Sequence, residues 1–163
     1  MTLLAIDGPA GAGKTTLAAK LEADYSKGST VKVIHMDDLY NGWEDALGQS
    51  LTDTLQSITQ AHLAGKNCTI KIFNWHLMNF DREEVITPTG YLILEGVGAA
   101  QEIVRKAGAT TYWLDIDEDR GLQRVLARDG AHIEKEMRLW QIQQSIHFAA
   151  DKTRENCEFK LTS

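Results

Sequence analysis

The stretch Gly8-Pro9-Ala10-Gly11-Ala12-Gly13-Lys14-Thr15 matches the pattern G-x-x-x-x-G-K-[ST], which is the signature of a phosphate-binding loop. An apolar run of strand length, residues 2–7, precedes it, and good helix formers follow in residues 16–21. A strand, a glycine-rich loop and a helix in this order are the context that the motif requires. The stretch therefore predicts a strand–loop–helix unit that binds a nucleoside triphosphate, in preference to an ordinary glycine-rich turn.

The residue types in this loop suit phosphate chemistry. Its glycines permit a tight turn and a close approach of the backbone to an anion, and the backbone N–H groups and the helix N-terminus present partial positive charge to it. We expect Lys14 to reach the β and γ phosphates and the Thr15 hydroxyl to ligate Mg²⁺. The loop residues predicted to bind nucleotide are Gly8, Ala10, Gly11, Ala12, Gly13, Lys14, Thr15 and Thr16.

The composition is that of a globular domain. The chain has 163 residues and a net charge of −6, which gives no electrostatic footprint for nucleic acid or for an anionic membrane surface. No apolar run approaches the length of a bilayer span, and residues 2–7 fit a strand better than a signal peptide. Cys68 and Cys157 are far apart, so we expect two free thiols in a cytoplasmic protein. The sequence does not predict an oligomeric state.

Strand-like and helical segments alternate along the rest of the chain. We expect a helix from near Ser50 to Gly65, begun by a capping-box pattern at residues 50–53, and a loop that could include one helical turn over 77–89. Alternation of this kind predicts an α/β fold with a parallel sheet covered on both faces and a ligand crevice at the carboxyl ends of the strands. The further strands are expected at 31–36, 68–73, 91–96, 111–116 and 157–161, and the further helices at 99–107, 118–128 and 133–153.

Carboxylates follow two of the predicted strands. Asp37 and Asp38 come at the end of the second strand, and Glu95 ends the buried run Tyr91–Leu94. At the edge of the sheet that carries the phosphate loop, such a group can hold Mg²⁺ or accept a proton from an attacking hydroxyl. The alternative is a turn cap at Asp37-Asp38 and a solvated Glu95. We favour function, and predict a metal site formed by Thr15, Asp37 and Glu95.

Arginines recur at helical spacing in residues 118–128. Arg120, Arg124 and Arg128 lie at i, i+4 and i+8, which places three guanidinium groups on one helix face. A solvated face paired with neighbouring acidic residues is the alternative, and we favour it for Arg120. For Arg124 and Arg128 we predict phosphate contacts, because the planar guanidinium fork matches phosphate oxygens. Arg138 is a weaker candidate from the next helix.

Aromatic rings gather in the two loops that should flank the crevice. Their flat faces suit stacking on a base or another planar ring, although packing in the core explains them equally well. The predicted acceptor-binding residues are Asp38, Tyr40, Trp43, Phe73, Trp75 and His76. His35, His62, His132 and His147 show no metal-ligand spacing and are expected to be structural or exposed, and Trp140 and Phe148 are expected in the core.

Four blocks of sequence, taken together, resemble a known family. The phosphate loop, Met36-Asp37-Asp38-Leu39-Tyr40, Leu92-Ile93-Leu94-Glu95-Gly96 and Arg124-Val125-Leu126-Ala127-Arg128-Asp129 are similar to the uridine kinase branch of the P-loop nucleoside and nucleotide kinases. The resemblance implies a three-layer P-loop NTPase fold with a five-stranded parallel sheet in the order 2-3-1-4-5. It also implies one domain over 1–163, a short helical lid around 118–140, and phosphorylation of a small hydroxyl-bearing acceptor with ATP and Mg²⁺.

The resemblance also assigns roles by position. Asp37 matches the catalytic aspartate that deprotonates the acceptor hydroxyl, Tyr40 matches a ring of the acceptor pocket, and Glu95 matches the acidic strand end near the metal. Arg124 and Arg128 match lid arginines, one of which packs on adenine while the other contacts phosphates. The predicted catalytic residues are therefore Lys14, Asp37, Arg124 and Arg128, and Arg124 joins the nucleotide-binding set.

The chain departs from the family in its substrate segment, and it is shorter than typical members, with no extra arginine-rich lid segment between Asp129 and Glu134. The usual Tyr-Asp pair of the substrate segment is replaced by Phe73-Asn74, followed by Trp75-His76, so kinase activity is predicted more firmly than uridine as acceptor. A nucleoside monophosphate kinase is one alternative, but residues 38–80 contain only Lys66 and Lys71 to bind a second phosphate. An ATP-binding switch or weak ATPase is the alternative from another class. The N-K-x-D pattern typical of guanine-specific proteins is absent.

Overall fold

Strand β1 (Thr2–Asp7) lies at the centre of a five-stranded parallel sheet, between β5 (Tyr91–Glu95) and β6 (Thr110–Asp115). The computed structural model describes all residues from 1 to 163. Strand β2 (Val31–His35) pairs with β5 at one edge of the sheet, and β7 (Phe159–Thr162) pairs with β6 at the other. All five strands are parallel, so their carboxyl ends, and the loops that follow them, meet at one edge of the sheet.

The predicted α/β class and five-stranded parallel sheet are confirmed. The observed order is β2-β5-β1-β6-β7, which differs from 2-3-1-4-5 in its labels because β3 and β4 lie outside the sheet. When only the five sheet strands are numbered along the chain, β5, β6 and β7 become the third, fourth and fifth, and the observed order coincides with the expected one.

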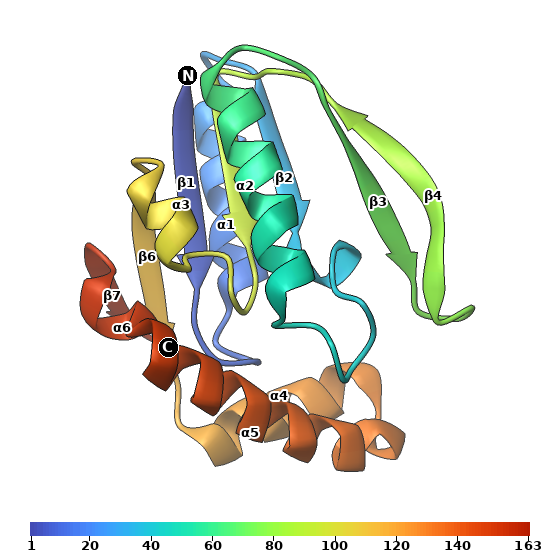
Figure 1. Cartoon of the computed structure of the whole chain (residues 1–163). Helices are drawn as coiled ribbons and strands as arrows, with labels where there is room; N and C mark the ends of the chain where they lie inside the picture. The colour runs from blue at the N-terminus through green and yellow to red at the C-terminus, as the bar shows by residue number, and fades with distance from the viewer.

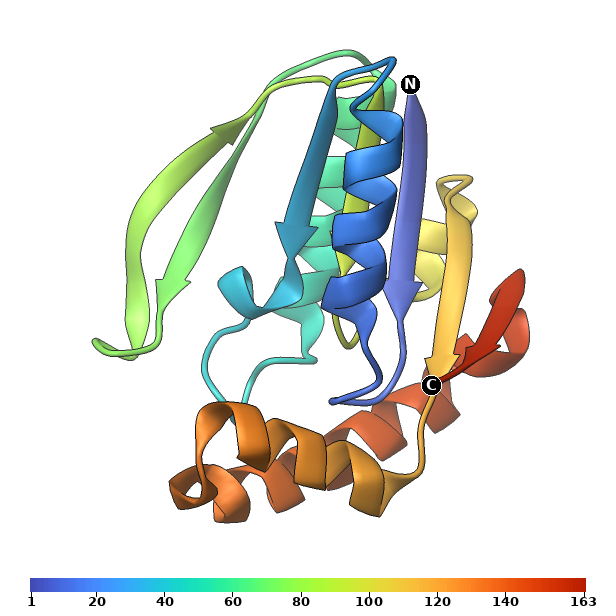
Figure 2. The same cartoon turned by 180° about the vertical axis from the view of Figure 1, so that it is seen from behind.

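Helices cover both faces of the sheet. Helix α1 (Lys14–Tyr25) lies on one face, and α2 (Gln49–Leu63) and α3 (Glu102–Lys106) lie on the other (Figures 1 and 2). Successive residues of β1 enter opposite cores: Leu3 and Ala5 join the large cluster beside α2, whereas Leu4 and Ile6 join the small cluster beside α1. A strand buried on both faces reads as a continuous apolar run, which explains the composition of residues 2–6.

Two further helices cross the carboxyl ends of the strands. Helix α4 (Glu118–Asp129) and helix α5 (Glu134–Asp151) lie below the sheet in Figure 1, joined by the single-turn helix η2 (Ala131–Ile133). The Asp117 carboxylate caps α4 by accepting from the backbone N–H groups of Asp119 and Arg120. The remaining short helices are η1 (Met36–Asp38) and α6 (Thr153–Asn156).

The expected loop over 77–89 is wrong. Strand β3 (Cys68–Asn74) pairs antiparallel with β4 (Asn79–Ile86), and this hairpin stands apart from the parallel sheet (Figure 1). Most side chains of β4 are exposed, so the strand lacks the apolar alternation by which a half-buried strand is recognised. The turn is set by the Asn74 side chain, which accepts from the backbone N–H groups of His76 and Leu77.

Several boundaries also differ from the expectation. Helix α2 begins at Gln49 after Gly48, with no side-chain cap, so the capping box expected at Ser50 does not form. Helix α3 begins at Glu102 instead of residue 99, because residues 98–100 form a loop held by a buried aspartate that is described below. Strand β7 occupies residues 159–162 instead of 157–161, and α5 ends at Asp151.

Candidate active site

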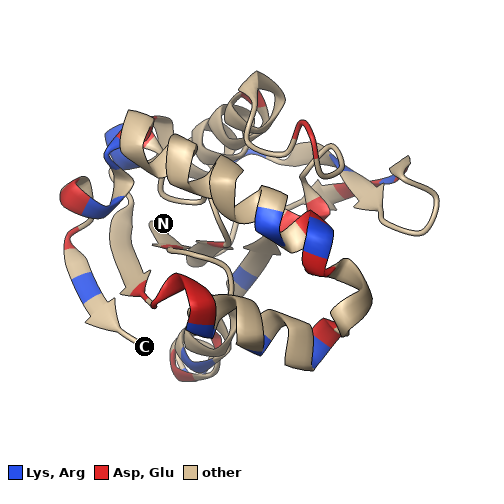
Figure 3. Cartoon of the chain, turned by 90° about the horizontal axis from the view of Figure 1, so that it is seen from below, with Lys and Arg blue, Asp and Glu red and all other residues tan.

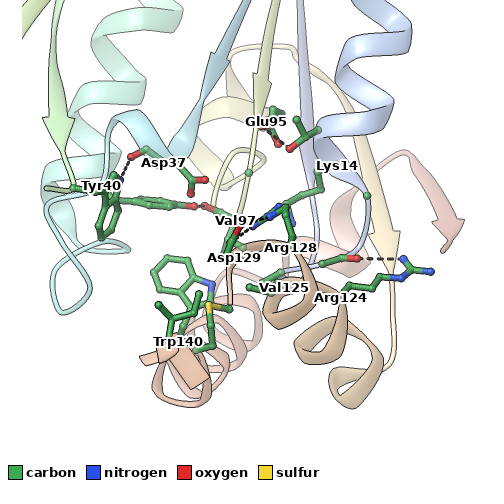
Figure 4. A pocket seen from close by; sticks show the side chains of 18 of the residues that line it. Lys14, Asp37, Tyr40, Glu95, Val97, Arg124, Val125, Arg128, Asp129 and Trp140 are labelled. Carbon is green, nitrogen blue, oxygen red and sulfur yellow. Dashed lines mark hydrogen bonds and ion pairs between the residues drawn. The ribbon is translucent and has the colours of Figure 1, made fainter. Parts of the chain in front are cut away.

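A cavity of about 470 Å³ opens where the phosphate loop, the ends of β2 and β5, and helices α4 and α5 meet (Figure 4). Its wall includes most of the residues singled out from the sequence, although these are spread from residue 10 to residue 128. The predicted residues that line it are Ala10, Gly11, Gly13, Lys14, Thr15, Thr16, Asp37, Tyr40, Trp43, Trp75, Glu95, Arg124 and Arg128. Gly8, Ala12, Asp38, Phe73 and His76 do not line it.

Glycines let the phosphate loop pass close to its neighbours. Gly8 has φ 140°, and a Cβ there would lie 2.3 Å from the Leu114 carbonyl oxygen. Gly11 has φ 83°, and a Cβ there would lie 2.4 Å from the carbonyl oxygen of Gly121 on α4. Gly8 thus shapes the loop without facing the cavity, and Ala12 is buried in the core beside α1. The tight contact between Gly11 and Gly121 fixes α4 against the loop.

Lys14 is almost completely buried at the start of α1 and still reaches the cavity. Its ammonium group donates to the Pro9 carbonyl oxygen at 2.7 Å, which folds the side chain back over the loop. Burial lowers the pKa of Lys14, and the nearby carboxylates of Asp7, Glu95 and Asp37 oppose that shift. The lysine is therefore the positive centre of a group of three acidic residues.

Thr15 and Glu95 lie together at the floor of the cavity. The Thr15 hydroxyl donates to Glu95 Oε1 at 3.2 Å, and His35 Nδ1 contacts the same oxygen. Hydroxyl and carboxylate oxygens are the ligands that Mg²⁺ prefers, usually one or two of them with phosphates and water completing the shell. No group of three or more His, Cys, Asp or Glu side chains is placed to hold a metal without such help. His35 was not predicted to lie in this group.

The Asp37 carboxyl opens onto the same cavity from the start of η1. Burial within the cleft walls raises the pKa of Asp37, as does the neighbouring Glu95, whereas Lys14 and Arg128 lower it. Its backbone carbonyl accepts a hydrogen bond from Trp75 Nε1 at 2.9 Å, which ties η1 to the end of the β3–β4 hairpin. The carboxyl thus faces the cleft near Lys14, remains accessible to solvent, and is more basic than an aspartate in water.

The two arginines of α4 that were predicted to contact phosphate both line the cavity. Arg124 Nη1 donates to the Gly11 carbonyl oxygen at 3.2 Å and to the Ser163 hydroxyl at 2.5 Å. Arg128 forms a two-point contact with Asp129, at 2.7 and 2.6 Å, and this contact raises the pKa of Arg128 (Figure 4). Arg138 instead pairs with Glu134 on the surface.

Aromatic rings form the opposite part of the wall. Tyr40, Trp43 and Trp75 line the cavity as predicted, but Phe73 packs behind Trp75 with ring centroids 4.9 Å apart. Trp140, expected only in the core, is buried and also lines the cavity. Phe148 packs edge-on against Trp113, away from the site. The lining residues that sequence reasoning did not select are Gly96, Val97, Val125, Asp129, Ile133, Met137 and Trp140.

Solved structures share this arrangement of elements. A "Possible Uridine Kinase" from Bacillus stearothermophilus has 17% identity and a TM-score of 0.71 over 98% of this chain and 88% of its own. A candidate fructose transport system kinase from Silicibacter sp. TM1040 has 16% identity and a TM-score of 0.72 over 99% and 89%. The chain has the fold of the P-loop kinases. Shikimate kinase from Bacteroides thetaiotaomicron aligns less closely, with 16% identity and a TM-score of 0.56 over 99% and 85%.

Identity this low supports the P-loop kinase fold and nothing finer. No protein-family model and no curated protein matches the sequence. None of the helices combines the length and the apolarity that a membrane span requires.

A buried aspartate, Asp7, connects two loops at the carboxyl end of the sheet, and the sequence did not predict this role. The Asp7 carboxylate accepts from the backbone N–H groups of Gly8, Gly98 and Ala100 at 2.7, 3.1 and 2.8 Å. Burial raises the pKa of Asp7, and its hydrogen bonds to Ala100 and Gly8 partly offset that shift. Asp7 therefore joins the start of the phosphate loop to the loop after β5. Within the run Thr2–Asp7 it resembled a plain strand end.

Replacing Asp7 with Ala should lower the free energy of unfolding by about 2–4 kcal/mol, because three buried N–H groups lose their acceptor. Asp7→Asn keeps one acceptor oxygen and should lose less. Urea denaturation measures both values. The matched control is Asp24→Ala, which removes an exposed aspartate paired with Lys27 and should leave the unfolding midpoint unchanged. Equal midpoints for Asp7→Ala and the control would contradict the anchoring role.

Proposed function

We propose that the protein is a kinase that uses ATP and Mg²⁺ to phosphorylate a hydroxyl group of a small, nucleoside-like molecule. The observation that supports this most strongly is the single cavity shared by the phosphate loop with Lys14, by the Asp37 carboxyl and by an aromatic wall. A triphosphate bound on the loop would face an acceptor held against the rings, with Asp37 beside the acceptor hydroxyl.

The phosphate side of the cavity suits the triphosphate. Backbone N–H groups of the loop and the Lys14 ammonium would bind the β and γ phosphates, and Arg124 and Arg128 would add positive charge from α4. Thr15 and Glu95 would hold Mg²⁺, with Asp37 nearby, since their oxygens suit a hard cation. The ion, when bound, neutralises charge on the phosphate oxygens.

Asp37 would act as the general base. The acceptor hydroxyl gives its proton to the Asp37 carboxylate as its oxygen attacks the γ phosphorus; the bond from that phosphorus to the β–γ bridging oxygen breaks, and ADP leaves. A carboxylate with a raised pKa is a better base than an aspartate in water. Arg128 contacts Asp129 and must leave this partner before it can bind a phosphate oxygen. We therefore propose that residues 118–140 move as a lid.

A small-molecule acceptor without phosphate fits the site best. The basic residues that line the cavity, Lys14, Arg124 and Arg128, all belong to the phosphate loop or α4, so nothing on the acceptor side would bind the second phosphate of a nucleoside monophosphate kinase. An ATP-binding switch would not need an aromatic pocket opposite the loop. We infer a single cytoplasmic domain over residues 1–163, in line with its two free cysteines.

A label-transfer screen tests this proposal. The protein is incubated with Mg²⁺, γ-labelled ATP and pools of nucleosides, nucleotides, sugars and vitamins, and the products are separated by chromatography. We expect label in an organic phosphate ester formed from an acceptor that carries no phosphate. Label found only in inorganic phosphate would favour the switch or weak ATPase, and label transferred to a nucleoside monophosphate would favour the monophosphate kinase.

A further inference from the structure

Four rings from three separate parts of the chain meet in the acceptor half of the cavity. We call Tyr40, Trp43, Trp75 and Trp140 the ring wall. Ring centroids are 5.1 Å apart for Tyr40 and Trp140, 6.3 Å for Trp43 and Trp140, and 5.3 Å for Trp43 and Trp75. All four line the cavity. Tyr40 and Trp140 lie on the opposite side of Figure 4 from Arg124. The rings thus pack against one another and form one continuous aromatic surface of the cavity.

Two of the four polar groups of the ring wall are already hydrogen-bonded within the protein. The Tyr40 hydroxyl donates to the Val97 carbonyl oxygen at 2.6 Å, and Trp75 Nε1 donates to the Asp37 carbonyl oxygen at 2.9 Å. The other residues that line this half are apolar, namely Val97, Ile133 and Met137. The ring wall therefore offers a bound acceptor the faces of its rings and the indole N–H groups of Trp43 and Trp140, but no charged side chain of its own.

Positive charge is confined to the other half. Lys14 is held by the Pro9 carbonyl, Arg124 by Gly11 and Ser163, and Arg128 by Asp129. The lining carboxylates are Asp37, Glu95 and Asp129. Figure 3 shows the same division on the helices, since charged residues lie on α4 and on the first turns of α5. Residues 139–150 of α5, which include Trp140, contain no Lys, Arg, Asp or Glu. An anionic acceptor would find no cationic side chain at the ring wall.

We propose that the ring wall selects a hydroxyl-bearing cation: a quaternary ammonium or a cationic aromatic ring that carries a primary alcohol. This inference rests on the proposed kinase function and specifies its acceptor. Cations are attracted to the faces of aromatic rings, tryptophan most strongly, and a cage of several rings is the usual arrangement for quaternary ammonium groups. The negative charge of the Asp37 carboxylate also attracts a cation. The cationic group takes no part in the transfer, in which the alcohol oxygen bonds to the γ phosphorus and its proton passes to Asp37.

Three acceptors on one scaffold test the inference. Benzyl alcohols with a para carboxylate, a para carboxamide or a para trimethylammonium group are similar in size and differ in charge. Binding to the ADP-bound protein is followed by quenching of tryptophan fluorescence, and phosphorylation is followed with labelled ATP. We expect the trimethylammonium compound to bind about 2- to 30-fold more tightly than the carboxamide, and the carboxylate to bind most weakly.

Variants locate the effect at the ring wall. Trp43→Leu removes one ring and should reduce the preference for the trimethylammonium compound over the carboxamide, while Trp43→Phe keeps a ring and should reduce it less. The control Phe159→Leu removes a ring that stacks on Tyr112 outside the cavity and should leave the preference unchanged. A preference that persists in Trp43→Leu, or a carboxylate bound as tightly as the cation, would overturn the inference.

The two proposals fail in different ways. If the trimethylammonium compound binds with the expected preference and receives no label, the kinase proposal fails and the selection of a cation stands. If label passes to the carboxylate compound as readily as to the others, the kinase proposal stands and the selection of a cation is wrong. Failure of all three compounds to bind would also overturn the inference, because the ring wall is open to the cavity in which they were expected.

Discussion

Replacing Lys14 with Ala should lower the rate of phosphoryl transfer on the order of 10³-fold. Lys14 is the cation at the centre of the site, close to Asp7, Asp37 and Glu95. Without it, charge that develops on the transferring phosphoryl group loses its preorganised partner, and Asp37 and Glu95, which line the cavity, repel the triphosphate. Initial rates of product formation at saturating ATP measure the effect.

The matched control is Lys20→Ala. Lys20 lies on the same helix, α1, but its side chain is exposed and away from the cavity, so its removal should leave turnover unchanged. Circular dichroism verifies that both variants are folded. A Lys14→Ala protein that is folded and retains more than a tenth of the wild-type rate would contradict the assignment of Lys14 to the phosphates.

Asp37→Asn should lower turnover by about 10²- to 10⁴-fold, which is the range for removal of a positioned general base. The amide has the same shape as the carboxyl and its backbone carbonyl can still accept from Trp75, so the walls of the cavity should persist. Affinity for ATP should change much less than turnover. Asp38→Asn is the matched control, because Asp38 is the next residue in η1 and does not line the cavity. Equal losses in the two variants would exclude Asp37 as the base.

The raised pKa of Asp37 fixes the direction of two pH effects. The folded protein holds a proton on this carboxyl at higher pH than the unfolded chain, whose aspartate has the ordinary value of 3.8. The free energy of unfolding therefore falls as the pH rises from 3.8 through the raised pKa. Above that pKa, the ionised carboxylate continues to destabilise the folded protein. Thermal melts at neutral pH should show Asp37→Asn to be no less stable than wild type. In kcat/KM, the acid limb should lie above pH 3.8.

The sequence predicted the parts of the fold that local pattern encodes. Residues 2–21 were predicted correctly as strand, loop and helix, because residues 3–6 of the strand are apolar and the loop needs its glycines. The β3–β4 hairpin was only half found, since Cys68–Asn74 alternates in burial while Asn79–Ile86 is mostly exposed. No local rule marks an exposed strand with charged side chains, so its pairing becomes visible only in three dimensions.

The site was predicted where it follows strand ends and missed where helices approach it from a distance. Asp37 and Glu95 end neighbouring strands, and parallel topology brings those ends together. Trp140 lies on α5, eight residues before Phe148, which is a spacing typical of the buried face of a helix. The residues next to it in sequence do not indicate that it lines a cavity. Asp7 and His35 were not predicted as part of the site because the residues that they contact, Ala100 and Glu95, are distant in sequence.

The hairpin β3–β4 meets the rest of the molecule through a small set of contacts. Ile70, Ile72 and Ile86 enter the large core, Lys32 of β2 pairs with Glu84, and Trp75 reaches the carbonyl of Asp37. Its strands share no backbone hydrogen bonds with the parallel sheet. Mutation can therefore change the exposed side chains and the turn of this hairpin without shifting the register of the sheet or the phosphate loop. Over evolutionary time, changes in such a hairpin can alter which acceptor is bound while the residues that bind the triphosphate stay the same.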